Sequence, residues 1–176
     1  MNVFVGGTRT LKNLDETARA KILAIVNKEY RILVGDCYGI DTAVQHFLSN
    51  LGYRNVSVFA TNGRARNNIG NWPIISVSTG KNVKGFKYYQ AKDIAMAKEA
   101  DCGFMIWDGK SRGTLNNIIN LASDNKTVLL YLPLTNEQLV FTSHQELCDK
   151  FGEQFINEYL QCRAEESYEQ NNGREY

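Results

Sequence analysis

Residues 101–114 read DCGFMIWDGKSRGT, an apolar run that passes directly into a loop with two glycines. The run from Cys102 to Trp107 has almost no polar atoms and no period-two alternation, which is typical of a parallel strand buried on both faces. The loop from Asp108 to Thr114 then opens a helical pattern. This stretch therefore predicts a strand, a tight glycine turn and a helix, the repeating unit of an α/β fold.

The same alternation of strands and helices extends along most of the chain. Strands are expected at 3–5, 31–34, 55–60, 73–77 and 127–132, and further helices at 15–28, 40–51, 87–100 and 145–162. We therefore predict a single α/β domain over residues 1–162, with a Rossmann-like parallel sheet flanked by helices on both faces. Residues 163–176 are expected to form a polar C-terminal tail.

The composition excludes several classes of protein. The 176 residues carry a net charge of +1, so overall charge favours no partner. The four cysteines and two histidines have no metal-ligand spacing, and we expect no metal and no cofactor. Neither a signal peptide nor an apolar run near the ~20 residues of a membrane span is present, so a cytoplasmic protein without a membrane partner is expected.

Ligands of such sheets bind beyond the carboxyl ends of the strands, so the residues that follow each strand are the candidates for a site. Three glycine-bearing loops emerge there, at 6–9, 35–41 and 108–114. Glycine lets backbone N–H groups approach an anion, and the start of a helix adds the positive end of its dipole. Each loop alone predicts only a tight turn, but three loops at one edge predict an anion-binding site.

The charge distribution adds a second signal. The stretch 60–92 holds six basic and no acidic residues, namely Arg64, Arg66, Lys81, Lys84, Lys87 and Lys92. Such a run most often forms a solvated surface, but beside a nucleotide-type site it favours an anionic ligand or a nucleic acid.

At these loops the chain resembles the SLOG superfamily, which unites the Lonely-guy phosphoribohydrolases and the DNA-processing protein A family. The resemblance rests on the sequence VGGTR at 5–9, GDCYGID at 35–41 and the stretch 101–115, and it covers roughly residues 1–132. It implies a Rossmann-like nucleotide-binding domain. Lys92 falls where the Lonely-guy enzymes carry an arginine, and Asn117 falls where they carry a glutamate. Because an amide is neither an acid nor a base, the family's hydrolysis is expected to be absent by that route.

We therefore predict a module that senses or sequesters a phosphorylated, nucleotide-derived ligand such as ADP-ribose. Two alternatives stay open: a hydrolase or transferase of N-glycosidic bonds that uses Asp36, Asp41 or Asp108, and a nucleic-acid-binding protein. The predicted ligand-binding residues are Gly6, Gly7, Thr8, Arg9, Gly35, Asp36, Gly39, Lys92, Asp108, Gly109, Lys110, Ser111, Arg112, Gly113, Thr114 and Asn117. Catalytic residues, if any, are not identified by the sequence.

Several of these residues also have structural interpretations. Asp41 is expected to cap the helix at 40–51, and Asp108 to hold ribose hydroxyls or cap its turn. Tyr88, Tyr89 and Trp107 are expected in the core rather than against a base. A homodimer is expected through the helix at 87–100, whose small apolar residues include Ala95 and Ala97.

Overall fold

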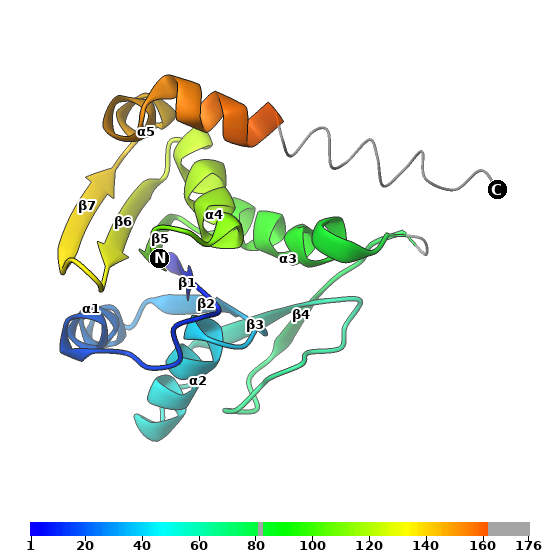
Figure 1. Ribbon diagram of the computed structural model, residues 1–176. Helices are drawn as coiled ribbons and strands as arrows, with labels where there is room; N and C mark the ends of the chain where they lie inside the picture. Colours follow the sequence, from blue (N-terminus) through cyan, green and yellow to red (C-terminus); the bar gives the residue numbers. More distant parts are fainter. Residues whose placement is uncertain (81–82, 162–176) are drawn as a thin grey trace.

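The computed structural model describes residues 1–80 and 83–161, which form one layered α/β structure (Figure 1). Seven strands make a sheet with the order β4-β3-β2-β1-β5-β6-β7. Strands β1 to β6 run parallel to their neighbours, and β7 pairs antiparallel with β6. The strands are β1 (Asn2–Gly7), β2 (Arg31–Gly35), β3 (Val56–Thr61), β4 (Ile74–Val77), β5 (Cys102–Ile106), β6 (Thr127–Leu132) and β7 (Glu137–Phe141).

Helices cover both faces of the sheet (Figure 1). On one face, α1 (Glu16–Asn27) and α2 (Ile40–Asn50) bury residues such as Ile22 and Leu48 against the strands. The opposite face is covered by α3 (Gly85–Glu99), α4 (Arg112–Ser123) and α5 (His144–Phe151), and residues 153–161 continue as a further helical segment. The central strands are therefore buried on both sides, which explains why β5 carries an unbroken apolar run.

This architecture confirms the predicted fold class, and most predicted elements lie within two residues of their observed bounds. Two expectations about the C-terminal part were wrong. Strand β7 was not foreseen, and the expected helix over 145–162 is interrupted at Gly152, whose φ of 91° breaks the helical path. The expected end of the domain at Cys162 and the polar tail at 163–176 lie outside the described residues.

Two further expectations concern membranes and assembly. In the described ranges 1–80 and 83–161, no helix is long and apolar enough to cross a bilayer. Ala97 of α3 is 1% exposed and packs in the chain's own core, and Ala95 packs partly against it. A homodimer through α3 therefore stays a prediction, and these alanines have a role within one chain.

Candidate functional site

The loops that follow β1, β2 and β5 meet at the carboxyl edge of the sheet, as the sequence predicts. Thr8, which is 1% exposed, joins all three. Its N–H donates to the Ile106 carbonyl at 3.0 Å, and its carbonyl accepts from the Ile40 N–H at 3.1 Å. Its hydroxyl accepts from the Asp108 N–H at 3.1 Å. Thr8 is thus a structural junction that holds the three loops in register.

Two of the loop glycines make this close packing feasible. A Cβ on Gly7 would overlap the carbonyl oxygen of Ile106. Gly39, the N-cap residue of α2, has a φ of 87°, and a Cβ there would lie 2.5 Å from the Arg9 Cα. These glycines therefore serve the approach of one loop to another.

We expect Gly39→Ala to lower the free energy of unfolding by at least about 2 kcal/mol, because it combines a strained φ with overlap against the backbone. Gly52→Ala is the matched control: Gly52 also has a positive φ, of 66°, but a Cβ there meets nothing within 4 Å. Only the conformational cost of about 1 kcal/mol applies to Gly52. Urea denaturation of both variants measures the difference, and equal losses would contradict the packing argument.

The loop between β5 and α4 is closed by its own side chains. Oδ1 of Asp108 accepts from the N–H groups of Lys110 and Ser111 at 2.9 and 2.7 Å, and Oδ2 accepts from the Thr10 hydroxyl at 3.0 Å. Burial tends to raise the pKa of Asp108, but these donors hold it below its usual value. Ser111 is the N-cap of α4. Of the two roles expected for Asp108, capping the turn is the one that the contacts support.

The remaining residues of this loop differ in their surroundings. Lys110 is exposed, and the Arg112 guanidinium lies over the Tyr159 ring with its Cζ 5.8 Å from the ring centroid. A Cβ on Gly109 or Gly113 would enter open space. The loop thus leaves room beside Gly113, while Arg112 extends toward the helical segment 153–161.

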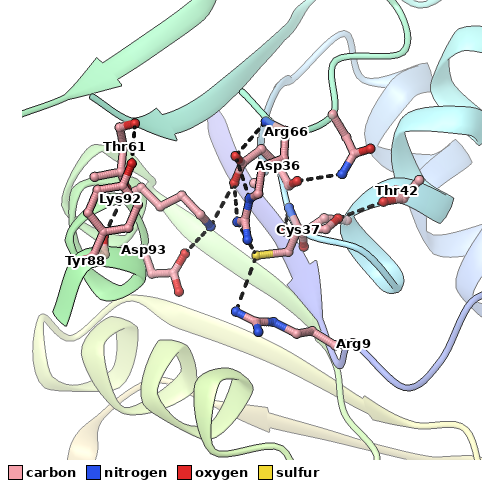
Figure 2. Close-up of polar contacts among 12 residues, drawn as sticks. Arg9, Asp36, Cys37, Thr42, Thr61, Arg66, Tyr88, Lys92 and Asp93 are labelled. Carbon is pink, nitrogen blue, oxygen red and sulfur yellow. Dashed lines mark hydrogen bonds and ion pairs between the residues drawn. The ribbon is translucent and has the colours of Figure 1, made fainter. Parts of the chain in front are cut away.

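A buried cluster of charges lies beneath the converging loops (Figure 2). Lys92 of α3 is 1% exposed, and its Nζ lies 2.6 Å from Oδ1 of Asp93 and 3.8 Å from Oδ1 of Asp36. Asp41 is 7% exposed, and its Oδ2 accepts from the Cys37 N–H at 3.2 Å. A side chain on Gly35 would occupy the space where the Asp41 carboxylate and the Lys92 ammonium lie. The surroundings of Lys92 therefore differ from those of an ordinary solvated lysine.

The cluster raises the pKa values of both Lys92 and Asp41, but for different physical reasons. Burial would lower the pKa of Lys92, but the Asp93 and Asp41 carboxylates raise it above its usual value. Burial raises the pKa of Asp41 to about 6; the charge of Lys92 opposes this shift and that of Asp93 adds to it. Asp41 does not cap α2 through a side-chain hydrogen bond, so the expectation of a cap was wrong.

Asp36 fastens the polar connection between β3 and β4 to the site (Figure 2). Its carboxylate accepts from the Arg66 N–H at 3.0 Å, from Arg66 Nε at 3.1 Å and from Arg66 Nη2 at 2.8 Å. Its carbonyl accepts from Asn67 Nδ2 at 2.8 Å. Burial tends to raise the pKa of Asp36, but the bonds from Arg66 lower it overall. This carboxylate is therefore already paired within the protein.

Two hollows open at this edge. A small pocket of about 50 Å³ is lined by residues from all three loops and from α3. A wider pocket of about 470 Å³ lies beside it, between the end of β3 and the first turns of α3. Residues of the small pocket include Gly7, Arg9, Cys37, Asp41, Lys92, Asp93, Ser111, Gly113, Thr114 and Asn117. Residues of the wide pocket include Asp36, Thr61, Arg64, Arg66, Tyr88 and Tyr89.

Asn117 stands out in the small pocket. It is 8% exposed, and its Oδ1 is buried without a hydrogen-bond partner among the described residues. A buried polar atom of this kind costs about 1–3 kcal/mol unless something satisfies it. An acceptor held unsatisfied at a pocket wall suits a ligand that brings a hydrogen-bond donor.

The structure thus brings together only part of the predicted set. Gly7, Arg9, Lys92, Ser111, Gly113, Thr114 and Asn117 line the small pocket, and Asp36 lines the wide one. Gly6, Thr8, Gly35 and Gly39 lie in strand ends and loop junctions. Asp108, Gly109, Lys110 and Arg112 are absent from the walls of both pockets.

Sequence reasoning missed several residues of the site and misjudged two aromatic ones. Cys37, Arg66 and Asp93 were outside the predicted set, although Arg66 belongs to the basic stretch. Trp107 packs in the core against Phe151, as expected. Tyr88 and Tyr89, by contrast, are half-buried and line the wide pocket.

Comparison with known proteins supports the fold. No family model and no curated protein sequence matches this chain. Among solved structures, DNA processing protein A from Helicobacter pylori is similar, with a TM-score of 0.58 over 92% of this chain and 80% of that one. The sequence identity is 14%, so the likeness extends to the fold alone. That protein is described as binding single-stranded DNA. The expected fold of the DNA-processing family is confirmed, whereas membership of the SLOG superfamily stays a prediction.

Proposed function

We propose that this protein binds a phosphorylated, nucleotide-type ligand at the carboxyl edge of its sheet. The observation that carries the proposal is the buried Oδ1 of Asn117, which lines the small pocket without a partner among the described residues. A ribose hydroxyl or an amino group is the kind of donor that would satisfy it.

The other walls of the small pocket suit the same class of ligand. Arg9 and Lys92 bring positive charge, which the carboxylates of Asp41 and Asp93 on the same walls partly offset. The first turn of α4 at Ser111 and Gly113 adds the positive end of a helix dipole. Acceptors and cations in one pocket match a ligand that carries both hydroxyl groups and a phosphate. Binding serves to sense or to sequester such a ligand.

The carboxylates favour binding over cleavage of an N-glycosidic bond. Asp36 is held by Arg66, and Asp108 accepts from two backbone N–H groups, so neither is poised as a nucleophile or a base. Asn117 cannot exchange a proton. Asp41 is the remaining candidate for a catalytic carboxylate. The residue is only 7% exposed and lies near Lys92 and Asp93.

Asn117→Leu tests the proposal directly. We expect it to raise the free energy of unfolding by about 1 kcal/mol, since it removes an unsatisfied buried acceptor, and to weaken nucleotide binding about 10-fold. Calorimetry with AMP and ADP-ribose measures affinity, and urea denaturation measures stability.

Asn120→Leu on the same helix is the matched control. Asn120 carries a buried, unpartnered Nδ2 but is absent from the walls of the small pocket. This variant should gain stability and bind as the parent does. The proposed function would be wrong if Asn117→Leu bound the nucleotides as tightly as Asn120→Leu does. It would also be wrong if the parent protein bound no mononucleotide, dinucleotide or ADP-ribose.

Single-stranded DNA is a second candidate ligand, favoured by the similar fold of a protein described as binding it. Arg64 lines the wide pocket as a cation for a polynucleotide backbone, and the exposed part of Arg66 suits an unpaired base. A competition experiment distinguishes the two candidate ligands. If a short single-stranded oligonucleotide binds far more tightly than AMP, and if its affinity falls steeply with salt concentration, DNA is the favoured ligand.

A further inference from the structure

The wide pocket is adjacent to the proposed ligand site and is lined by different side chains. Its volume of about 470 Å³ falls in the range of small-molecule sites. Its walls combine aromatic rings and arginines, chiefly Tyr88, Tyr89, Arg64 and Arg66. The two hollows adjoin at Arg9, which lines the small pocket and whose Cζ lies 5.5 Å from the centroid of Tyr89.

Arg66 is fixed in this wall by its hydrogen-bonding edge. Nε and Nη2 donate to the two oxygens of Asp36, and Nη2 also contacts Cys37 Sγ at 2.9 Å. A guanidinium bound bidentately to a carboxylate has a fixed plane. The side chain is nevertheless 32% exposed. The Nε–Nη2 edge of Arg66 is already bonded to Asp36, so this edge is not available to grip a phosphate. Arg66 is better placed to contact a ligand through the flat face of its guanidinium.

Tyr89 supports the Arg66 guanidinium, which lies over its ring. The Arg66 Cζ lies 4.7 Å from the centroid of the Tyr89 ring, within the range of a cation–π contact. Tyr89 is held in turn by an edge-to-face contact with Tyr88, whose ring centroid lies 5.3 Å away. Tyr88 is tied to β3 because its hydroxyl donates to the Thr61 carbonyl, and its own carbonyl accepts from the Thr61 hydroxyl. The aromatic wall is therefore anchored to the sheet.

We propose that the wide pocket is a subsite for a planar heteroaromatic base, which stacks on the guanidinium of Arg66 where the Tyr89 ring supports it. This inference rests on the proposed function and assigns a place to the base of the nucleotide-type ligand. Guanidinium planes and aromatic rings are the surfaces on which proteins stack unpaired bases. Asp36 also lines this pocket, and its carboxylate sets the plane of the Arg66 guanidinium.

The test compares ligands with and without a base. We expect the parent protein to bind AMP at least about 10-fold more tightly than ribose 5-phosphate, since stacking alone contributes that much in other proteins. Tyr89→Ala removes the ring that supports the Arg66 guanidinium, so it should weaken AMP binding by a similar factor and leave ribose 5-phosphate within about twofold of the parent. Tyr89→Phe keeps the ring and should keep the preference. Calorimetry with AMP, GMP, CMP, UMP and ribose 5-phosphate supplies the constants.

A second variant tests the role of Arg66. Arg66→Lys keeps the positive charge but loses the planar guanidinium. The preference for AMP over ribose 5-phosphate should therefore fall, even if ribose 5-phosphate binds as before. Arg19→Lys, at an exposed position on α1, is the control and should change neither affinity. Circular dichroism and urea denaturation check that each variant is folded.

The outcomes separate this inference from the proposed function. If the parent binds ribose 5-phosphate as tightly as every mononucleotide, or if Tyr89→Ala leaves the AMP preference intact, the base subsite is overturned while the ligand site stands. If the parent binds none of these compounds, the proposed function fails and the subsite fails with it.

Discussion

Lys92→Met should lower the free energy of unfolding by about 3–5 kcal/mol at neutral pH, the usual cost of removing one partner from a buried ion pair. Methionine fills a similar volume, so the loss comes from charge rather than from a cavity. Lys92 is 1% exposed and is the cation that approaches both Asp93 and Asp36 within 4 Å among the described residues. Without it, the half-buried carboxylate of Asp93 and the buried carboxylate of Asp41 are left near one another without this cation.

Urea denaturation at pH 7.5 measures this loss, and Lys98→Met is the matched control. Lys98 lies on the same helix with an exposed side chain, so its replacement should change stability by less than about 0.5 kcal/mol. Lowering the pH through the Asp41 pKa of about 6 should shrink the effect of Lys92→Met, because protonated Asp41 no longer needs a nearby cation. A Lys92→Met protein as stable as the parent would show that the cluster is not a coupled unit.

The sheet could be predicted because its signals are local. The apolar residues of β5 indicate a strand covered on both faces, and the glycines within 108–114 indicate the turn that precedes α4. Asp15 was rightly placed near the start of α1, where its side chain accepts from the Ala18 N–H. Such signals depend on neighbours within one turn of the chain, so the sequence alone displays them.

The C-terminal part was harder to predict for the same physical reason. Strand β7 lies at the edge of the sheet, and its side chains are exposed at Glu137, Gln138 and Val140, so it lacks the apolar run of the central strands. Its pairing with β6 follows a turn in which Asn136 has a φ of 54°. Gly152 interrupts a hydrophobic pattern that otherwise has helical spacing. Neither strand β7 nor the break at Gly152 alters the periodicity of apolar residues enough to be predicted from the sequence.

The site was only partly predictable, because its chemistry comes from contacts over long sequence separations. The three loops were placed correctly at one edge, and Asn117 was singled out. The burial of Lys92 depends on Asp36 and Asp41, which arrive from the loop after β2, more than fifty positions earlier in the chain. The contact between Arg66 and Tyr89 likewise needs the sheet to bring two connections together. The type and spacing of residues in the sequence do not predict which distant residues will pair.

Asp41→Asn should stabilise the protein at high pH and have little effect near pH 4. Burial holds the pKa of Asp41 at about 6 in the folded protein, against 3.8 for the free side chain. Between these two values the folded state binds more protons than the unfolded state, so the contribution of Asp41 to stability falls as the pH rises. Above pH 6 the folded protein carries the full cost of this buried charge, about 3 kcal/mol for a shift of this size.

Asparagine removes that cost while its Oδ1 can still accept from the Cys37 N–H, and Lys92 keeps its short contact with Asp93. We therefore expect Asp41→Asn to gain about 1–3 kcal/mol at pH 8, with the gain declining through pH 6 and vanishing near pH 4. Urea denaturation of both proteins across this range measures the difference, with Asp124→Asn at an exposed position as the control. A gain that grows toward low pH, or a loss at pH 8, would mean that Asp41 is stabilised by Lys92 more than burial disfavours its charge.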